Sequence, residues 1–383
     1  MSDETPPQPE RLEGAPHPRD TLNLIGQDAA QEAFLDAFNT GRLHHAWMLT
    51  GPRGIGKATL AWRIARFLLA TPEANDGGMF GDSLPPPTNL DIPADHPVTH
   101  RIAAGAEPSV HLVRLGGKGS TDSDRIKNFA DKKYSSVIRV DEIRELSSFI
   151  HMSAADGGRR VVIVDDADLM NPNASNALLK MLEEPPARTY FLLISHQPSA
   201  LLPTIKSRCR TLNLHTLNPE DVSAAMAQAD VQAANAHALA ALSGGSVGGA
   251  MRLSLLGGAA LYAELVGIMG TLPHMDRGRA LKLAEMAAAR GGEAKRDLLF
   301  SLIDLLLSRM ARAGATGTPP AYEACVGETQ TLMRLAPNPH QARVWADLAA
   351  EIGTRARHGI AVNLDPAALV LDTFIKMAKA APR

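Results

Sequence analysis

The chain has 383 residues, of which 45% are hydrophobic and 4% aromatic, and its formal charge at pH 7 is −2. A chain of this length exceeds a single typical core, so we expect two or three domains. The near-neutral charge excludes attraction to nucleic acid or anionic lipid through a global field. Any contact with DNA would therefore be local or shared with partner chains.

The cysteine content and the apolar runs restrict the location of the protein. Cys209 and Cys325 are the only cysteines, which is too few for a disulfide framework or for an all-cysteine zinc site. We therefore expect no zinc and a reducing compartment. No stretch reaches the roughly 18 uncharged apolar residues that a membrane span requires. These features predict a soluble, cytoplasmic protein without a membrane partner.

The chain begins with a tail, a helix and a strand. Residues 1–20 are rich in proline and acidic side chains and contain no apolar run, which predicts a disordered tail. Residues 27–40 carry apolar side chains at helical spacing, and Gly41 follows as a typical helix stop. The short apolar run at 46–50 predicts the first strand.

A glycine-rich loop follows this strand directly. The pattern G-x-x-x-x-G-K runs from Gly51 to Lys57. Such glycines let successive backbone N–H groups turn inwards around phosphate oxygens, and the lysine reaches the outer phosphates. The helix that begins at Lys57 adds its dipole. The candidate nucleotide-binding residues are Gly51, Gly54, Ile55, Gly56, Lys57, Ala58 and Thr59.

The last position of this motif departs from the complete pattern. A complete loop has Ser or Thr after the lysine, because that hydroxyl ligates Mg²⁺. This chain has Ala58 there, and Thr59 is one place too late, since one helical step turns a side chain by about 100°. We expect that ATP could still bind but that magnesium-assisted hydrolysis is weakened.

The region between the loop helix and the next apolar strand is mostly polar. Residues 72–108 are rich in proline, glycine and aspartate, which predicts an exposed loop, and the histidines near it lack metal-ligand spacing. Residues 110–115 alternate as a strand. The insertion at 116–136 has mixed charge and is interpreted as a solvated loop, with a DNA-touching loop as the alternative. Residues 140–153 then predict a helix.

A buried strand that ends in two acids is the centre of the chain. Residues 161–164 are Val-Val-Ile-Val, typical of a strand covered on both faces. Asp165 and Asp166 follow at its carboxyl end, where open parallel sheets bind ligands. The two carboxylates are therefore a candidate site for a metal ion and a water molecule. An amphipathic helix comes next and ends at Pro185 and Pro186.

Further strands at 190–195 and 211–214 alternate with helices, which predicts an α/β fold with a doubly wound parallel sheet. After His215 the composition changes to alanine-rich helices. Three short ones, expected at 219–229, 231–242 and 246–256, form a compact unit. Longer amphipathic helices follow to the C-terminus and predict a bundle, with expected ranges 260–271, 277–290, 293–313, 321–335, 340–357 and 366–380.

Four strings of residues resemble a known family. They are NALLKMLEEPP at 176–186, SRC at 207–209, GRLHHA at 41–46 and VNLDP at 362–366. Together with the glycine loop they resemble the clamp-loader branch of the AAA+ ATPases, and within it the delta-prime subunits of bacterial DNA polymerase III. The resemblance covers residues 21–383. It implies an AAA+ P-loop core at 21–215, a three-helix lid at 216–257 and an oligomerising helical collar at 258–383.

The resemblance also implies roles for single residues. Asp165 would hold magnesium and Asp166 would polarise the attacking water, although glutamate is usual there and aspartate is a methylene shorter. Ser195 or His196 would be the polar sensor of the γ-phosphate. A second sensor position, an arginine in hydrolysing members, corresponds here to Gly248, and Arg252 lies about one helical turn further on.

Arg208 in the SRC string corresponds to the arginine finger, which acts in trans on the nucleotide site of a neighbouring subunit. The resemblance thus implies a subunit with weak or absent ATPase activity of its own, in a hetero-pentamer with gamma/tau-type and delta-type subunits. The sliding clamp and primer-template DNA would be partners through the complex. The alternative is a catalytically active gamma/tau-type subunit, but this chain lacks the four-cysteine zinc module, the hydroxyl after Lys57 and the second-sensor arginine.

Overall fold

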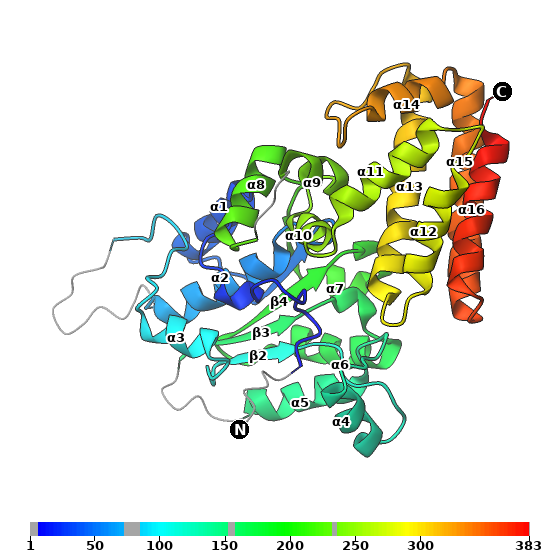
Figure 1. Cartoon of the computed structure of the whole chain (residues 1–383). Coiled ribbons are helices and arrows are strands. Elements are labelled where there is room, and N and C mark those ends of the chain that lie inside the picture. Colours follow the sequence, from blue (N-terminus) through cyan, green and yellow to red (C-terminus); the bar gives the residue numbers. More distant parts are fainter. Residues whose placement is uncertain (1–6, 73–84, 152–157, 232–235, 383) are drawn as a thin grey trace, which may run out of the picture. The chain divides into compact units, whose positions relative to one another are not determined.

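A computed structural model describes residues 7–72, 85–151, 158–231 and 236–382. The chain divides into two compact units (Figure 1). The first contains the residues up to Leu217 together with Ser246–Gly248, and the second contains Asn218–Gly245 and Gly249–Arg383. The predicted boundary after residue 215 lies within two residues of the end of the first unit's main segment.

A parallel sheet forms the centre of the first unit. Within the described residues it has five strands in the order β2-β3-β4-β1-β5, and each neighbouring pair is parallel. The strands are β1 (Ala46–Thr50), β2 (Val110–Val113), β3 (Arg160–Val164), β4 (Thr189–Ser195) and β5 (Arg210–Asn213). All five predicted strands are present, so the predicted α/β class is confirmed.

Helices pack on both faces of this sheet. Successive strand residues point to opposite faces, so Val162 and Val164 lie in a core with α5 and α6, whereas α2 contacts β1, β3 and β4. Residues 161–164 are all 0% exposed, as expected for a strand covered twice. The α-helices of this unit are α1 (Asp28–Asn39), α2 (Lys57–Ala70), α3 (Pro97–Ala103), α4 (Asp122–Ala130), α5 (Val140–His151), α6 (Pro172–Glu183) and α7 (Pro203–Lys206).

The N-terminal segment differs from the prediction of a disordered tail. Residues 1–6 lie outside the described residues, but Ala15 and His17 are buried, and a short 3-10 helix spans Pro18–Asp20. The Glu10 carboxylate accepts a hydrogen bond from Arg114 Nη1 at 2.6 Å and lies 3.1 Å from His17 Nε2. The tail prediction was therefore wrong over residues 7–20, because composition does not reveal these long-range partners.

Two segments interpreted as loops also contain helices. In the 72–108 segment, α3 buries Val98 and Ile102, and the His96 side chain caps it by accepting a hydrogen bond from Val98 N at 3.2 Å. In the 116–136 insertion, α4 begins after Thr121, whose hydroxyl accepts from Asp124 N at 3.2 Å. Both helices are short, so their apolar periodicity is too brief to detect from sequence.

The described part of the second unit is helical. Its helices are α8 (Pro219–Gln228), α9 (Ala236–Ser243), α10 (Val247–Leu255), α11 (Gly258–Gly270), α12 (Arg277–Ala288), α13 (Glu293–Thr316), α14 (Glu328–Leu335), α15 (Pro339–Ala361) and α16 (Pro366–Ala380), with the first residues of α10 grouped in the first unit. The division into lid and collar stays a prediction. The expected helix at 321–335 begins later, at Glu328, whose buried carboxylate accepts hydrogen bonds from Tyr262 and Arg309.

A search of the described helices finds none that alone has the length and apolar character of a bilayer span. The bent pair α10 and α11 passes the same test of length and composition when its two helices are taken together.

The sheet core makes a first prediction. Ile163 in β3 is 0% exposed, whereas Ile126 on α4 is 73% exposed. Ile163→Ala leaves a cavity in a packed interior, so we expect the free energy of unfolding to fall by about 2–5 kcal/mol. Ile126→Ala, the same chemical change at the surface, should alter it by less than about 0.5 kcal/mol. Urea unfolding measures both, and equal losses would contradict this assignment of the core.

Candidate functional site

The glycine loop connects the end of β1 to the start of α2. Gly51 has φ +136° and Gly56 has φ +104°, backbone conformations that side chains rarely adopt. A Cβ on Gly51 would lie 2.5 Å from Leu214 O, so this position also lacks the room for a side chain. Ile55, between these glycines, is buried at 1% exposure. Two loop positions therefore require glycine, and phosphate binding by the loop stays a prediction.

The loop lysine is turned onto the loop itself. Lys57 is 2% exposed, and its Nζ donates hydrogen bonds to Gly51 O at 2.6 Å and to Pro52 O at 2.5 Å. Burial lowers the pKa of the Lys57 ammonium to about 8. In this arrangement the cation that would bind outer phosphates satisfies backbone carbonyls instead.

Both carboxylate oxygens of Asp166, the second acid after β3, have side-chain partners. Asp166 Oδ1 forms an ion pair with His196 Nε2, and Oδ2 pairs with Arg53 Nη2 at 3.0 Å. Burial acts to raise the pKa of Asp166, but His196 and Arg53 outweigh burial, and the net pKa lies below its usual value. Both oxygens of this carboxylate thus have side-chain partners within the chain.

The first acid has a different environment. Burial, reinforced by the negative charge of Asp166, raises the pKa of Asp165 to about 7. Asp165 also donates its backbone N–H to Val113 O at 2.9 Å, which continues the β2–β3 ladder beyond the strands. Near neutral pH this carboxyl is therefore partly protonated, which weakens it as a ligand for a cation.

The two sensor candidates lie at the end of β4, and their role stays a prediction. Ser195 pairs with Thr50 of β1 in the parallel register, is 0% exposed, and its Oγ has no hydrogen-bond partner among the residues described. His196 donates its backbone N–H to Asp168 Oδ1 at 2.8 Å. The structure thus brings His196 and Asp166 together, and it adds Arg53 and Asp168, which the sequence analysis had not singled out.

A buried glutamine ties the loop to the end of the sheet. Gln27 Nε2 donates to Ile55 O at 3.1 Å and to His215 O at 2.7 Å, and Gln27 Oε1 accepts from His215 N at 3.1 Å. Gln27 is 3% exposed, so these bonds satisfy polar groups that would otherwise be unpaired in the interior. The sequence analysis treated Gln27 as the start of a helix. It did not predict these hydrogen bonds, because the partners of Gln27 are distant along the chain.

The segment Ser246–Gly248, which groups with the first unit, lies directly on the glycine loop. Ser246 Oγ donates to Arg53 O at 2.9 Å, and Gly248 N donates to Gly54 O at 2.9 Å. A Cβ on Gly248 would lie 3.1 Å from Gly54 Cα. The position that would carry the second-sensor arginine is therefore occupied by a glycine in backbone contact with the loop.

These contacts do not fit a magnesium ion. Ala58 has no hydroxyl to offer, Asp166 has both oxygens paired, and burial raises the pKa of Asp165. Across the described ranges, no group of three or more His, Cys, Asp or Glu side chains could hold a metal. In this arrangement Lys57 is bonded to loop carbonyls and Asp166 has both oxygens paired, so neither side chain is presented to a ligand.

Arg208 lies between α7 and β5 at the surface. Its side chain is 36% exposed, Nη2 pairs with Glu183 Oε1 at 2.9 Å, and Nη1 donates to Thr204 O at 3.0 Å. Glu183 belongs to the NALLKMLEEPP string, so the two most specific strings meet at this ion pair. The neighbouring Cys209 packs against the sheet core, and burial raises its pKa to about 12.

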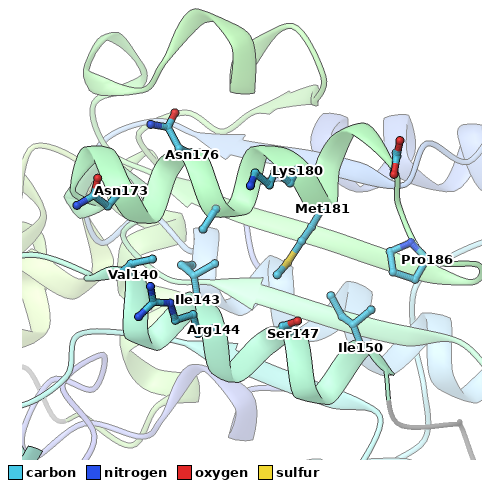
Figure 2. Close-up of a pocket in the computed structure, with 12 residues that line it drawn as sticks. Val140, Ile143, Arg144, Ser147, Ile150, Asn173, Asn176, Lys180, Met181 and Pro186 are labelled. Carbon is cyan, nitrogen blue, oxygen red and sulfur yellow. The ribbon is translucent and has the colours of Figure 1, made fainter.

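A groove between α5 and α6 is a second surface feature. Figure 2 shows Ile143 and Ile150 of α5 facing Met181 of α6, with Lys180 and Asn176 on the α6 side. Its volume is about 650 Å³. Arg144 also lines it and pairs with Asp141 at 3.1 Å. The sequence analysis did not identify this groove, because both helices were interpreted only through their buried faces.

The environment of Asp165 predicts a pH dependence. Its pKa in the folded chain, about 7, lies above the value of about 4 typical of an unfolded chain, so stability falls as the pH rises between these values. Asp165→Asn removes the buried charge. We expect it to raise the melting temperature above pH 7 and to lose this advantage towards pH 5. Asp95→Asn, at an exposed aspartate, is the control, and a pH-independent difference for Asp165→Asn would contradict the assignment.

Comparison with known proteins identifies the family. A family model described as "DNA polymerase III, delta subunit" matches residues 26–218, half of the chain. The delta′ subunit of DNA polymerase III from Pseudomonas aeruginosa is 39% identical over 165 residues, which cover 43% of this chain and 41% of that protein. The Escherichia coli delta′ subunit is 32% identical over 226 residues and 58% of each chain.

Other relatives are more distant. The gamma subunit of DNA polymerase III from Buchnera aphidicola is 28% identical over 54% of this chain and 47% of that protein. The chain thus spans about half the length of the curated relatives it matches. A gamma-subunit-related structure from Thermotoga maritima is 16% identical with a TM-score of 0.34, covering 90% of this chain and 99% of that one. On the match over residues 26–218 and the two delta′ relatives, the chain belongs to the DNA polymerase III delta-subunit family and is a delta-prime-like clamp-loader subunit.

Proposed function

We propose that this chain is a non-hydrolysing or feebly hydrolysing subunit of the DNA polymerase III clamp loader that donates Arg208 to the nucleotide site of a neighbouring subunit. In this role it supports ATP-dependent loading of the sliding clamp onto primed DNA. The proposal rests on the difference between Arg208 and the two charged residues of the glycine-loop site in the same unit. Arg208 stands at the surface, whereas Lys57 and Asp166 are paired internally.

The environment of Arg208 suits a residue that acts on another chain. Its ion pair with Glu183 is partly exposed, and such pairs contribute only about 0–1 kcal/mol. The guanidinium can therefore exchange this carboxylate for a phosphate at little cost. Its planar fork can donate two parallel hydrogen bonds to phosphate oxygens, which lysine cannot do.

The partners follow from the family. We propose a hetero-pentamer with gamma/tau-type and delta-type subunits in the cytoplasm, with the sliding clamp and primer-template DNA bound through the complex. The relatives at 39% and 32% identity are delta′ subunits of DNA polymerase III, which supports this assembly.

The second candidate is a working gamma/tau-type ATPase subunit. The 28% identity to a gamma subunit favours it, as does the intact run from Gly51 to Lys57. Ala58, the glycine at 248 and the internally paired Asp166 favour the first proposal, because each removes a group that hydrolysis requires.

Arg208→Ala tests the role in trans. An arginine finger accelerates phosphoryl transfer by roughly 10³ to 10⁵, so we expect the neighbouring site to lose its turnover. The measurement is the ATPase rate of the reconstituted loader with clamp and primed DNA, and gel filtration checks that assembly is unchanged. Arg208→Lys keeps the charge without the fork and should stay impaired. Arg42→Ala, at an exposed arginine of the same unit, is the control.

Glu183→Ala refines this test, because it removes the partner of Arg208 and keeps the arginine. We expect the stimulated rate to remain at the wild-type level or to rise. An unchanged rate with Arg208→Ala, or an equal loss with Glu183→Ala and Arg208→Ala, would refute a role of the guanidinium in trans.

The isolated chain provides an independent test. Because Ala58 offers no hydroxyl and Asp166 is paired, the purified chain should release phosphate from ATP and magnesium no faster than a Lys57→Ala variant. Phosphate release is measured at several enzyme concentrations. A hydrolysis rate that rises in proportion to enzyme concentration and is lost in the Lys57→Ala variant would favour a gamma/tau-type ATPase subunit.

A further inference from the structure

The cations of the glycine loop have partners inside the chain. Arg53, at the third position of the loop, reaches Asp166 at 3.0 Å, and Lys57 donates to two loop carbonyls. His196 pairs with the other oxygen of Asp166. The Arg53 guanidinium and the His196 imidazole thus stand beside the carboxylate at which a nucleotide complex would bring a metal ion.

The backbone of the glycine loop also accepts hydrogen bonds from the segment Ser246–Gly248. Gly248 N–H donates to Gly54 O at 2.9 Å, and Ser246 Oγ donates to Arg53 O at 2.9 Å. A Cβ on Gly54 would lie 2.4 Å from Ser246 Oγ, so the two segments are in close contact. Two backbone carbonyls of the loop therefore have internal donors.

When a ligand binds only one of two states of a protein, its apparent affinity is reduced by the fraction of molecules in that state. A nucleoside triphosphate with magnesium has to displace the ion pairs of Asp166 and the lysine bonds before it can use the same groups. The contacts are therefore competitors of the ligand, and breaking one of them should strengthen binding by the free energy of that contact.

We propose that the Arg53–Asp166–His196 ion-pair chain is an internal lock that holds the glycine loop in a closed state and opposes the binding of nucleotide phosphates. The lock provides partners for both oxygens of Asp166, fixes the Arg53 side chain and holds the loop closed. It is independent of the role of Arg208, since its residues are not those of the surface ion pair.

The lock predicts that removing Arg53 changes nucleotide affinity in the opposite direction to the change expected if Arg53 bound phosphate directly. If Arg53 were a cation available to phosphates, Arg53→Ala would weaken nucleotide binding. If Arg53 instead stabilises the closed loop through Asp166, the same change should tighten nucleotide binding, by up to about fivefold for a partly exposed pair. The Arg53 side chain is 67% exposed, so the variant should fold.

The experiment titrates the full-length chain with ATPγS by calorimetry, with and without magnesium. We expect Arg53→Ala to bind more tightly than the wild type. Asp166→Asn, which removes both ion pairs at once, should bind magnesium-free ATPγS more tightly. Hydrogen exchange of the amides at 51–57, measured without ligand, should become faster in both variants, a readout that requires no activity.

Arg101→Ala is the matched control, because it removes a similar arginine–carboxylate pair, to Glu107 at 2.7 Å, elsewhere in the same unit. It should leave affinity and loop exchange unchanged. Equal or weaker binding by both lock variants, or the same gain in Arg101→Ala, would overturn the lock. Neither result would bear on the stimulated ATPase of the Arg208 variants, so the two proposals fail separately.

Discussion

The parallel register of the sheet is the constraint on which the site depends. Thr50 of β1 pairs with Ser195 of β4, and Val164 of β3 pairs with Leu193. All strands run in one direction, so the glycine loop, the two acids and His196 follow strand ends at the same edge. Residues separated by more than a hundred positions can meet there, as Arg53 and Asp166 do at 3.0 Å.

Charge is distributed unequally over the first unit. At the sheet edge, Lys57 and Asp166 have internal partners and little exposure, whereas Arg208 is held by a partly exposed carboxylate. Buried charges need partners, because desolvation is expensive. Exposed pairs are weak and exchange easily. The same physical rule thus separates the buried Lys57, which needs its carbonyl partners, from the partly exposed ion pairs of Arg53 and Arg208.

Much of the fold could be predicted from sequence. The strand at 161–164 is uninterrupted and β-branched, and the helix after it has a continuous apolar face, so both were identified from local pattern. Glu10, Gln27 and Arg53 were missed, because their partners Arg114, His215 and Asp166 lie far along the chain. Periodicity reports which residues are buried, but it does not report which polar groups meet.

The backbone at Asp166 restricts which residues can replace it. Its φ of +54° is left-handed, a conformation that costs ordinary residues about 1–2 kcal/mol and that aspartate and asparagine tolerate best. Exchange for the longer glutamate would add strain and also disturb two ion pairs. The backbone at this position therefore favours the aspartate that takes part in the two ion pairs, independently of the alanine at position 58.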